Sequence, residues 1–249
     1  MQISRRSKFS LAQLLNVVDK PIIYLLFDKY DFDPEVVSSP VGISDEIISA
    51  SNDVLSEIIL EVVYSARTLR FGTNPKYKFD DQFEIFKKSL LLDGYLVVGN
   101  EINRLDPNFE GNEPVEDALV KEVDKSDILK KDAIIMAINA SADDFVSAQP
   151  DYNGSLTNIR IALETLVREI ALYKGFSTQK LGNTWGASLS HLKVNGFFDQ
   201  KDEAALSSVY TFISHGAHIP LGFSEEEFVR LGRNLCSSMC YFVIKRFNA

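Results

Sequence analysis

Two histidines that stand three residues apart are the first candidates for chemistry in this sequence. His215 and His218 lie in the run TFISHGAHIPLGF, between two segments with the apolar spacing of helices. A histidine side chain can transfer a proton near neutral pH or bind a transition metal. A metal site needs a third and usually a fourth ligand, and the remaining histidine, His191, lies off the apolar stripe of its own predicted helix. Because no Gly-x-Ser-x-Gly motif occurs either, we expect neither a metal site nor a Ser-His-acid hydrolase.

The same run also has a purely structural interpretation. Gly216 can end the first helix, and a histidine such as His215 is favourable at the C-terminal end of a helix dipole. Ser224 and Glu227 have the spacing of a capping box at the start of the next helix. The run can therefore be interpreted either as a connection between two helices or as a site of chemistry.

Charged residues at helical spacing form a second candidate. Arg160, Glu164 and Arg168 recur every four residues and share one face of a predicted helix. In one interpretation an arginine points into a cleft together with His215. In the other, the three residues form a ladder of ion pairs on the helix surface. The candidate catalytic constellation is therefore Arg160, Glu164, His215 and His218.

A basic segment with an aromatic residue is the third candidate. The segment ARTLRFGTNPKYKF gathers cations and a tyrosine that could meet phosphates and a base, namely Arg67, Arg70, Lys76, Tyr77 and Lys78. The alternative is that these cations only complement the C-terminal end of a helix dipole, since Asp80, Asp81 and Glu84 follow closely.

Composition excludes several classes of protein. The formal net charge of −9 argues against a protein whose whole surface binds phosphates, and the acidic residues concentrate between positions 101 and 132, which we interpret as a solvated connection. The two cysteines, Cys236 and Cys240, are predicted to be buried free thiols. No glycine-rich nucleotide fingerprint, apolar run of membrane-spanning length or signal peptide is present. We expect a cytoplasmic protein without metal, nucleotide cofactor or membrane contact.

The elements that must position these residues are predicted to be mainly α-helical. An N-terminal domain over residues 1–115 should contain a long helix from 44 to 71, a helix over 80–95 and a small β-hairpin near 95–105, an arrangement compatible with a winged-helix-like unit. A C-terminal helical bundle should occupy residues 126–249. Its last helix, which is apolar over much of its circumference, should lie in the middle.

The second half resembles a known family. The run NGSLTNIRIALETLVREIA, a helix with the single tryptophan, and the run GFFDQKDEAALSSVYTFISHGAHIPLGFSEEEF before a long last helix are similar to the helical C-terminal domains of bacterial abortive-infection-type proteins, which resemble the HEPN superfamily. The resemblance covers residues 126–247. It implies a helical bundle, a role in antiphage defence or toxin-antitoxin biology, and often a dimer.

Active HEPN ribonucleases place an arginine before a histidine with four to six residues between them, and the pair acts on RNA across a dimer. The positions at these distances before His215 are Tyr210, Val209 and Ser208, and no arginine stands there or before His218 and His191. The resemblance therefore implies a non-catalytic interaction module that binds a partner protein, a second copy or nucleic acid. The alternative is a metal-independent RNA-cleaving toxin that uses His215 or His218 with an arginine from elsewhere in the fold or dimer.

Overall fold

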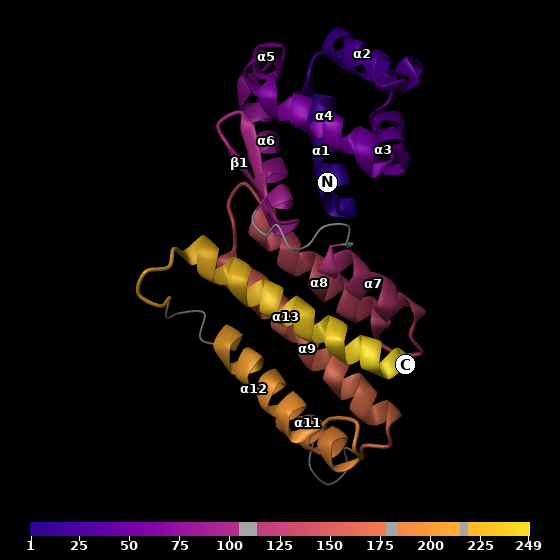
Figure 1. Ribbon diagram of the computed structural model, residues 1–249, viewed down its shortest axis with the longest axis vertical. Helices are drawn as coiled ribbons and strands as arrows, with labels where there is room; N and C mark the ends of the chain where they lie inside the picture. The colour runs from indigo at the N-terminus through magenta and orange to yellow at the C-terminus, as the bar shows by residue number, and fades with distance from the viewer. Residues whose placement is uncertain (105–113, 178–183, 215–218) are drawn as a thin grey trace. The chain divides into compact units, whose positions relative to one another are not determined.

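The protein is mainly helical with one small β-hairpin, as the sequence predicts (Figure 1). A computed structural model describes residues 1–104, 114–177, 184–214 and 219–249. The chain divides into two compact units, Met1–Pro114 and Val115–Ala249. His215 and His218 lie outside the described residues.

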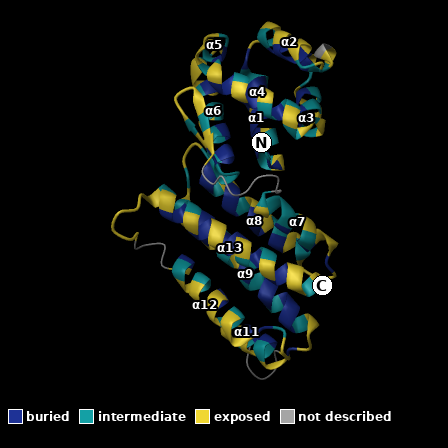
Figure 2. Ribbon diagram, in the orientation of Figure 1, coloured by how far each residue is buried: buried dark blue, intermediate teal, exposed yellow. Residues whose placement is uncertain are grey.

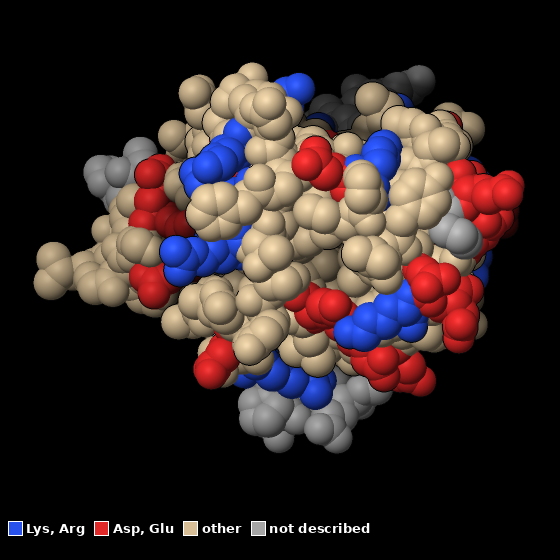
Figure 3. Space-filling view, turned by 90° about the horizontal axis from the view of Figure 1, so that it is seen from above, with Lys and Arg blue, Asp and Glu red and all other residues tan. Residues whose placement is uncertain are grey.

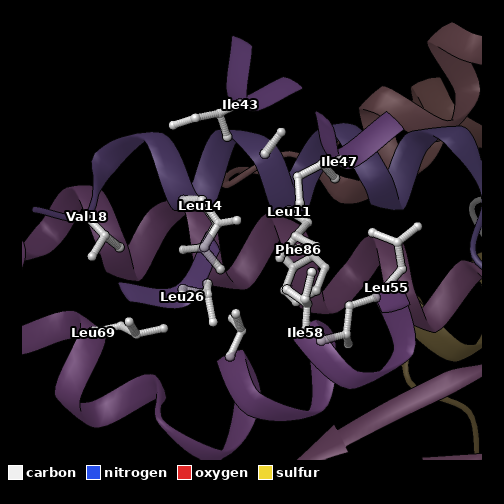
Figure 4. Close-up of a cluster of buried hydrophobic side chains, with 14 of the residues drawn as sticks. Leu11, Leu14, Val18, Leu26, Ile43, Ile47, Leu55, Ile58, Leu69 and Phe86 are labelled. Atoms are coloured by element: carbon white, nitrogen blue, oxygen red, sulfur yellow. The ribbon is translucent and has the colours of Figure 1, made fainter. Parts of the chain in front are cut away.

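The first unit is built from short helices and the hairpin. Its elements are α1 (Arg5–Val17), α2 (Lys20–Lys29), the 3₁₀ segment η1 (Pro34–Ser38), α3 (Pro40–Ser49), α4 (Asn52–Tyr64), α5 (Ala66–Phe71), α6 (Lys76–Leu92), β1 (Tyr95–Val98) and β2 (Glu101–Arg104). Its core is formed by apolar side chains from several helices, among them Leu11 and Leu14 of α1, Ile47 of α3, Leu55 of α4 and Phe86 of α6 (Figure 4).

The long helix predicted over residues 44–71 is wrong, because three helices occupy this stretch. Ala50 is extended, with φ −61° and ψ 146°, and ends α3. The Ser51 side chain then caps α4 by accepting a hydrogen bond from the Val54 N–H at 3.4 Å. Ser65 separates α4 from α5 and donates its hydroxyl to the Glu61 carbonyl at 2.6 Å. Serine side chains that bond to nearby backbone compete with helix continuation, and the apolar spacing masks this effect in the sequence.

The β-hairpin follows the predicted turn. Residues pair in antiparallel register from Tyr95 opposite Arg104 to Val98 opposite Glu101. Gly99 begins the two-residue turn with φ 61°, a left-handed conformation that glycine adopts without steric cost. Strand β1 packs against α6 and strand β2 against α4, so the hairpin is anchored to two helices of the first unit.

The second unit is a helical bundle around α9. Its helices are α7 (Val115–Lys125), α8 (Lys131–Val146), α9 (Tyr152–Tyr173), α11 (Trp185–Val194), α12 (Gln200–Ser214) and α13 (Glu225–Asn248). Helix α9 packs against α8, α11, α12 and α13. The last helix, which we expected in the middle, packs against α7, α9 and α12, so α9 has more helix neighbours than α13. Figure 2 shows exposed residues along one side of α13, where Leu231, Leu235 and Phe242 are partly open to solvent.

Small residues set the closest helix contacts of the bundle. Ser141 of α8 and Ser155 of α9 each donate a hydroxyl to the other's backbone carbonyl at 2.7 Å. On α13, a Cβ placed at Gly232 would lie 2.9 Å from Leu156 Cδ2 of α9, a distance that forces a shift. These three positions let α8 and α13 approach α9 more closely than larger side chains would permit.

The acid-rich stretch that the sequence suggests as a solvated connection contains a packed helix. Helix α7 buries Leu119 and Val123, which are four residues apart, and packs against α13 and α8. Its Glu116 forms an ion pair with Arg233, a completely buried residue of α13. Arg233 also donates a hydrogen bond to the Ser141 hydroxyl at 2.8 Å, so one guanidinium links three helices.

Candidate functional site

The predicted charged face of α9 meets two aromatic side chains of the neighbouring helices. Arg168 forms an ion pair with Glu164, and the Tyr210 hydroxyl of α12 donates a hydrogen bond to Glu164 Oε2 at 3.3 Å. Trp185 of α11 stacks on Tyr210, with ring centroids 4.4 Å apart and an interplanar angle of 10°. Together with Arg160, these residues form what we call the α9–α12 cluster.

Burial and charge fix the protonation of Tyr210 in this cluster. Burial raises the pKa of Tyr210, and the adjacent Glu164 carboxylate raises it further, although Arg160 and Arg168 act in the opposite direction. The phenol therefore remains a hydrogen-bond donor at neutral pH. Since Glu164 accepts from both Arg168 and Tyr210, its carboxylate serves as a clamp between α9 and α12.

Arg160 differs from Arg168 in its ion pairing. The Nε atoms of both arginines are buried without a hydrogen-bond partner within the described part of the chain, but of the two only Arg168 pairs with a described carboxylate. The electrostatic effect of Arg160 on Tyr210 places its charge near α12. Of the two ion pairs that the ladder would contain, the described residues form the one between Glu164 and Arg168.

The basic segment of the first unit is divided by the structure. Arg70 donates two hydrogen bonds to Asp80, at 2.6 and 2.8 Å, which lower the pKa of that carboxyl. Arg70 therefore joins α5 to α6. Arg67, Tyr77 and Lys78 are exposed, and Lys76 lies with its Nζ atom 4.7 Å from the ring centre of Phe71. Four of the five predicted contact residues thus remain accessible.

Sequence reasoning missed the aromatic residues that accompany these cations. Phe71 is 63% exposed and Tyr64 is 74% exposed. With exposed Leu60 and Arg67, they recur at positions i, i+4, i+7 and i+11, the spacing of one helix face. We call Leu60, Tyr64, Arg67 and Phe71 the α4–α5 stripe. The spacing is visible in the sequence itself, at every third or fourth position from Leu60 to Phe71.

An open depression of about 730 Å³ adjoins this stripe within the first unit. Leu60 and Tyr64 line it together with the hairpin residues Asn100 and Asn103. At its edge, Glu61 accepts hydrogen bonds from Lys29 Nζ at 2.5 Å and from the Tyr30 hydroxyl at 2.7 Å.

The charge of Glu61 is set by these two donors. Burial alone would raise the pKa of Glu61, but the bonds from Lys29 and Tyr30 outweigh burial and lower it. The depression therefore presents the paired acid Glu61, a second acid in Glu101, aromatic and aliphatic surface, and side-chain amides.

The two cysteines and His191 make packing and hydrogen-bond contacts within the fold. Cys236 and Cys240 are buried free thiols, as predicted, and the contact with Cys236 together with burial raises the pKa of Cys240. The His191 ring lies 3.2 Å from the Lys174 carbonyl. Over the described ranges, no three His, Cys, Asp or Glu side chains gather in a way that would hold a metal ion. Among the same residues, no helix has the length and apolar character needed to cross a membrane.

Comparison with known proteins yields no relative. No protein-family model, curated protein or solved structure matches the chain.

Proposed function

We propose that this protein is a non-catalytic interaction module of bacterial antiphage defence that binds a partner protein, a second copy of itself or nucleic acid in the cytoplasm. The resemblance of residues 126–247 to abortive-infection-type proteins supports the defence role, and two free thiols are typical of a reducing compartment. The HEPN arginine-to-histidine spacing is missing, which favours binding over cleavage.

The state of Glu164 carries the preference for a non-catalytic role. A general base must present a lone pair to the proton that it removes. Glu164 is held by the Arg168 guanidinium and the Tyr210 hydroxyl, and Tyr210 has a raised pKa. The acid and the phenol of the α9–α12 cluster thus stabilise the packing of α9 on α12 and are poorly placed to exchange protons.

A HEPN-like ribonuclease is the second candidate, and Arg160 favours it. An arginine without a carboxylate partner among the described residues is available to stabilise phosphate charge. Tyr210, which Arg160 influences electrostatically, precedes His215 by five residues in the sequence. In this alternative, Arg160 supplies the cation that is absent from the family spacing, and His215 or His218 transfers the proton.

Expression in a bacterial host separates the two candidates. The wild type and the single variants His215→Ala, His218→Ala and Arg160→Ala are compared for growth and for the integrity of total RNA. A non-catalytic module leaves RNA intact in all four strains. RNA fragments with the wild type that disappear with His215→Ala and Arg160→Ala would overturn the proposal in favour of the ribonuclease. Arg246→Ala is the matched control, because Arg246 is an exposed arginine paired with Asp202.

Phage plating tests the defence role directly. The gene is introduced together with its chromosomal neighbours, and the efficiency of plating of a phage panel is measured. We expect protection that the His215→Ala and His218→Ala variants retain. An unchanged efficiency of plating for every phage would remove the defence part of the proposal.

A further inference from the structure

The α4–α5 stripe is an exposed helix face on which aromatic rings alternate with a cation. Tyr64 and Phe71 expose 74% and 63% of their surface, and Arg67 lies between them in the sequence. Lys76 covers the Phe71 ring, and the adjacent Tyr77 is 62% exposed. Exposed rings of this number contribute little to folding, because they remain in water.

Charge complementarity indicates an anionic occupant. Residues 66–79 contain four cations and no acid in a chain whose formal net charge is −9. Two acids that border the stripe are paired, Glu61 with Lys29 and Asp80 with Arg70, while Glu101 of the hairpin lines the depression at the α4 end. Asp80 also attracts Lys76, but the charge of Arg67 meets no described carboxylate at ion-pair distance. The end of the stripe formed by α5 is therefore locally cationic.

The arrangement of these cations favours a single-stranded nucleic acid, which offers both bases and phosphates, over a duplex that is bound through its phosphates alone. In Figure 3, which looks onto the end of the first unit that holds α2 and α5, Lys and Arg side chains form separate groups, with Asp and Glu groups beside several of them and uncharged surface between. A duplex that is bound through its backbone requires a continuous basic strip. Isolated cations among exposed rings are typical of single-strand binding, in which bases stack on aromatic side chains.

We infer that the α4–α5 stripe, with Lys76 and Tyr77, binds single-stranded nucleic acid by stacking bases on Tyr64 and Phe71 and pairing phosphates with Arg67 and Lys76. The depression beside Tyr64 offers the amides of Asn100 and Asn103 to the edge of a base. The stripe spans twelve residues on two consecutive helices, so its ends lie at most about 16 Å apart along the helix direction, which corresponds to roughly four or five nucleotides. This inference names the ligand class of the interaction module proposed above and rests on that proposal.

Fluorescence anisotropy with the full chain tests the inference. The probes are single-stranded RNA and single-stranded DNA of mixed sequence and about 12 nucleotides, within the known range of site sizes, and the matching duplex. We expect both single strands to bind more tightly than the duplex. Two phosphate contacts predict a slope of about −1.4 for log K against log salt, so affinity falls about sevenfold between roughly 50 and 200 mM salt.

Single substitutions locate the binding surface. Phe71→Ala and Tyr64→Ala should each weaken single-strand binding by about 5- to 150-fold, the range for loss of one stacked base. Both side chains are largely exposed, and an unchanged thermal midpoint verifies folding. Phe9→Ala is the matched control, since Phe9 also carries a cation over its ring, from Arg5 at 5.6 Å, but lies on α1. This control should bind like the wild type.

The outcomes against the inference are distinct. No binding of either single strand at low salt, tighter binding of the duplex, or equal affinity of wild type and Phe71→Ala would each overturn it. A shift from dimer to monomer in Phe71→Ala, measured by sedimentation, would show that a second copy occupies the stripe instead. Loss of phage protection in His215→Ala with normal strand binding would count against the proposed function and leave the inference standing.

Discussion

The buried Arg233 provides the sharpest test of how the second unit is held together. Its side chain is 0% exposed, whereas Glu116, its partner, is 16% exposed. Replacing Glu116 with alanine removes this carboxylate from a guanidinium that stays in the interior. Breaking a buried pair from one side costs about 3–5 kcal/mol, a large share of the roughly 5–15 kcal/mol that stabilises a domain. We expect Glu116→Ala to lower the free energy of unfolding by about this amount.

The unequal exposure of the partners predicts an order of effects. Arg233→Met keeps much of the side-chain volume and leaves Glu116 at the rim, where water can reach its carboxylate. The loss should therefore be smaller, about 1–3 kcal/mol, as for a lost hydrogen bond to a charged group. Replacing both partners with uncharged residues, as in Arg233→Met with Glu116→Gln, should approach wild-type stability, because the desolvation of two charges is removed as well.

Urea unfolding followed by tryptophan fluorescence measures these differences. Trp185 is the single tryptophan of the chain and belongs to the second unit, so its signal reports that unit. Lys245→Ala is the control, since Lys245 is an exposed lysine that pairs with Glu122 at the surface and should change stability much less than Glu116→Ala. The reasoning is refuted if Glu116→Ala unfolds within about 1 kcal/mol of the wild type, or if Arg233→Met is the more damaging change.

Three further predictions concern titration, capping and thiols. Hydrogen bonds from Asn248 and Lys245 lower the pKa of Glu122 from 4.5 to about 2. The stabilising contribution of the Glu122 carboxylate is therefore present above about pH 4.5 and is lost as the pH falls towards 2. The stability difference between wild type and Glu122→Gln should shrink over that interval in acid titrations followed by circular dichroism. Ser224→Ala removes the capping box of α13 and should cost about 1 kcal/mol in urea unfolding, and a loss below about 0.3 kcal/mol would contradict the assigned cap. The buried thiols of Cys236 and Cys240 should react with a thiol reagent only after unfolding, so rapid modification of the native protein would contradict their burial.

Long helices with clear ends could be predicted from the sequence because local and tertiary preferences agree. The last helix begins at Ser224, whose side chain accepts from the Glu227 N–H while Glu227 bonds back to the cap, as the spacing predicts. The hairpin turn at Gly99 could be predicted for the same reason, because a left-handed glycine fits a two-residue connection.

The features that the sequence did not reveal depend on competition between signals. At Ser51 and Ser65, the apolar spacing favours one continuous helix, whereas side-chain hydrogen bonds of the serines favour a helix end. The structure has separate helices on either side of both serines. In α7, the acids suggest a solvated segment, yet Leu119 and Val123 are sufficient to fix the helix on the bundle. Arg233 gives no local indication of its burial, because its partner Glu116 stands far away in the sequence.

The candidate site was only partly predictable for a related reason. The helix face of Arg160, Glu164 and Arg168 follows from spacing alone, but the commitment of Glu164 to Tyr210 requires the packing of α12 on α9. Likewise, Arg70 and Lys76 look equivalent in the sequence, and only the fold assigns one to Asp80 and the other to Phe71.

The reciprocal bonds between Ser141 and Ser155 restrict how this protein can diverge. Each hydroxyl reaches the other helix's carbonyl at 2.7 Å, so neither position has room for a branched or long side chain. A library randomised at both codons and selected for folded protein should return serine, alanine or glycine at each. Lineages that keep this bundle should consequently retain small residues here while the solvent-facing positions of α8 vary freely.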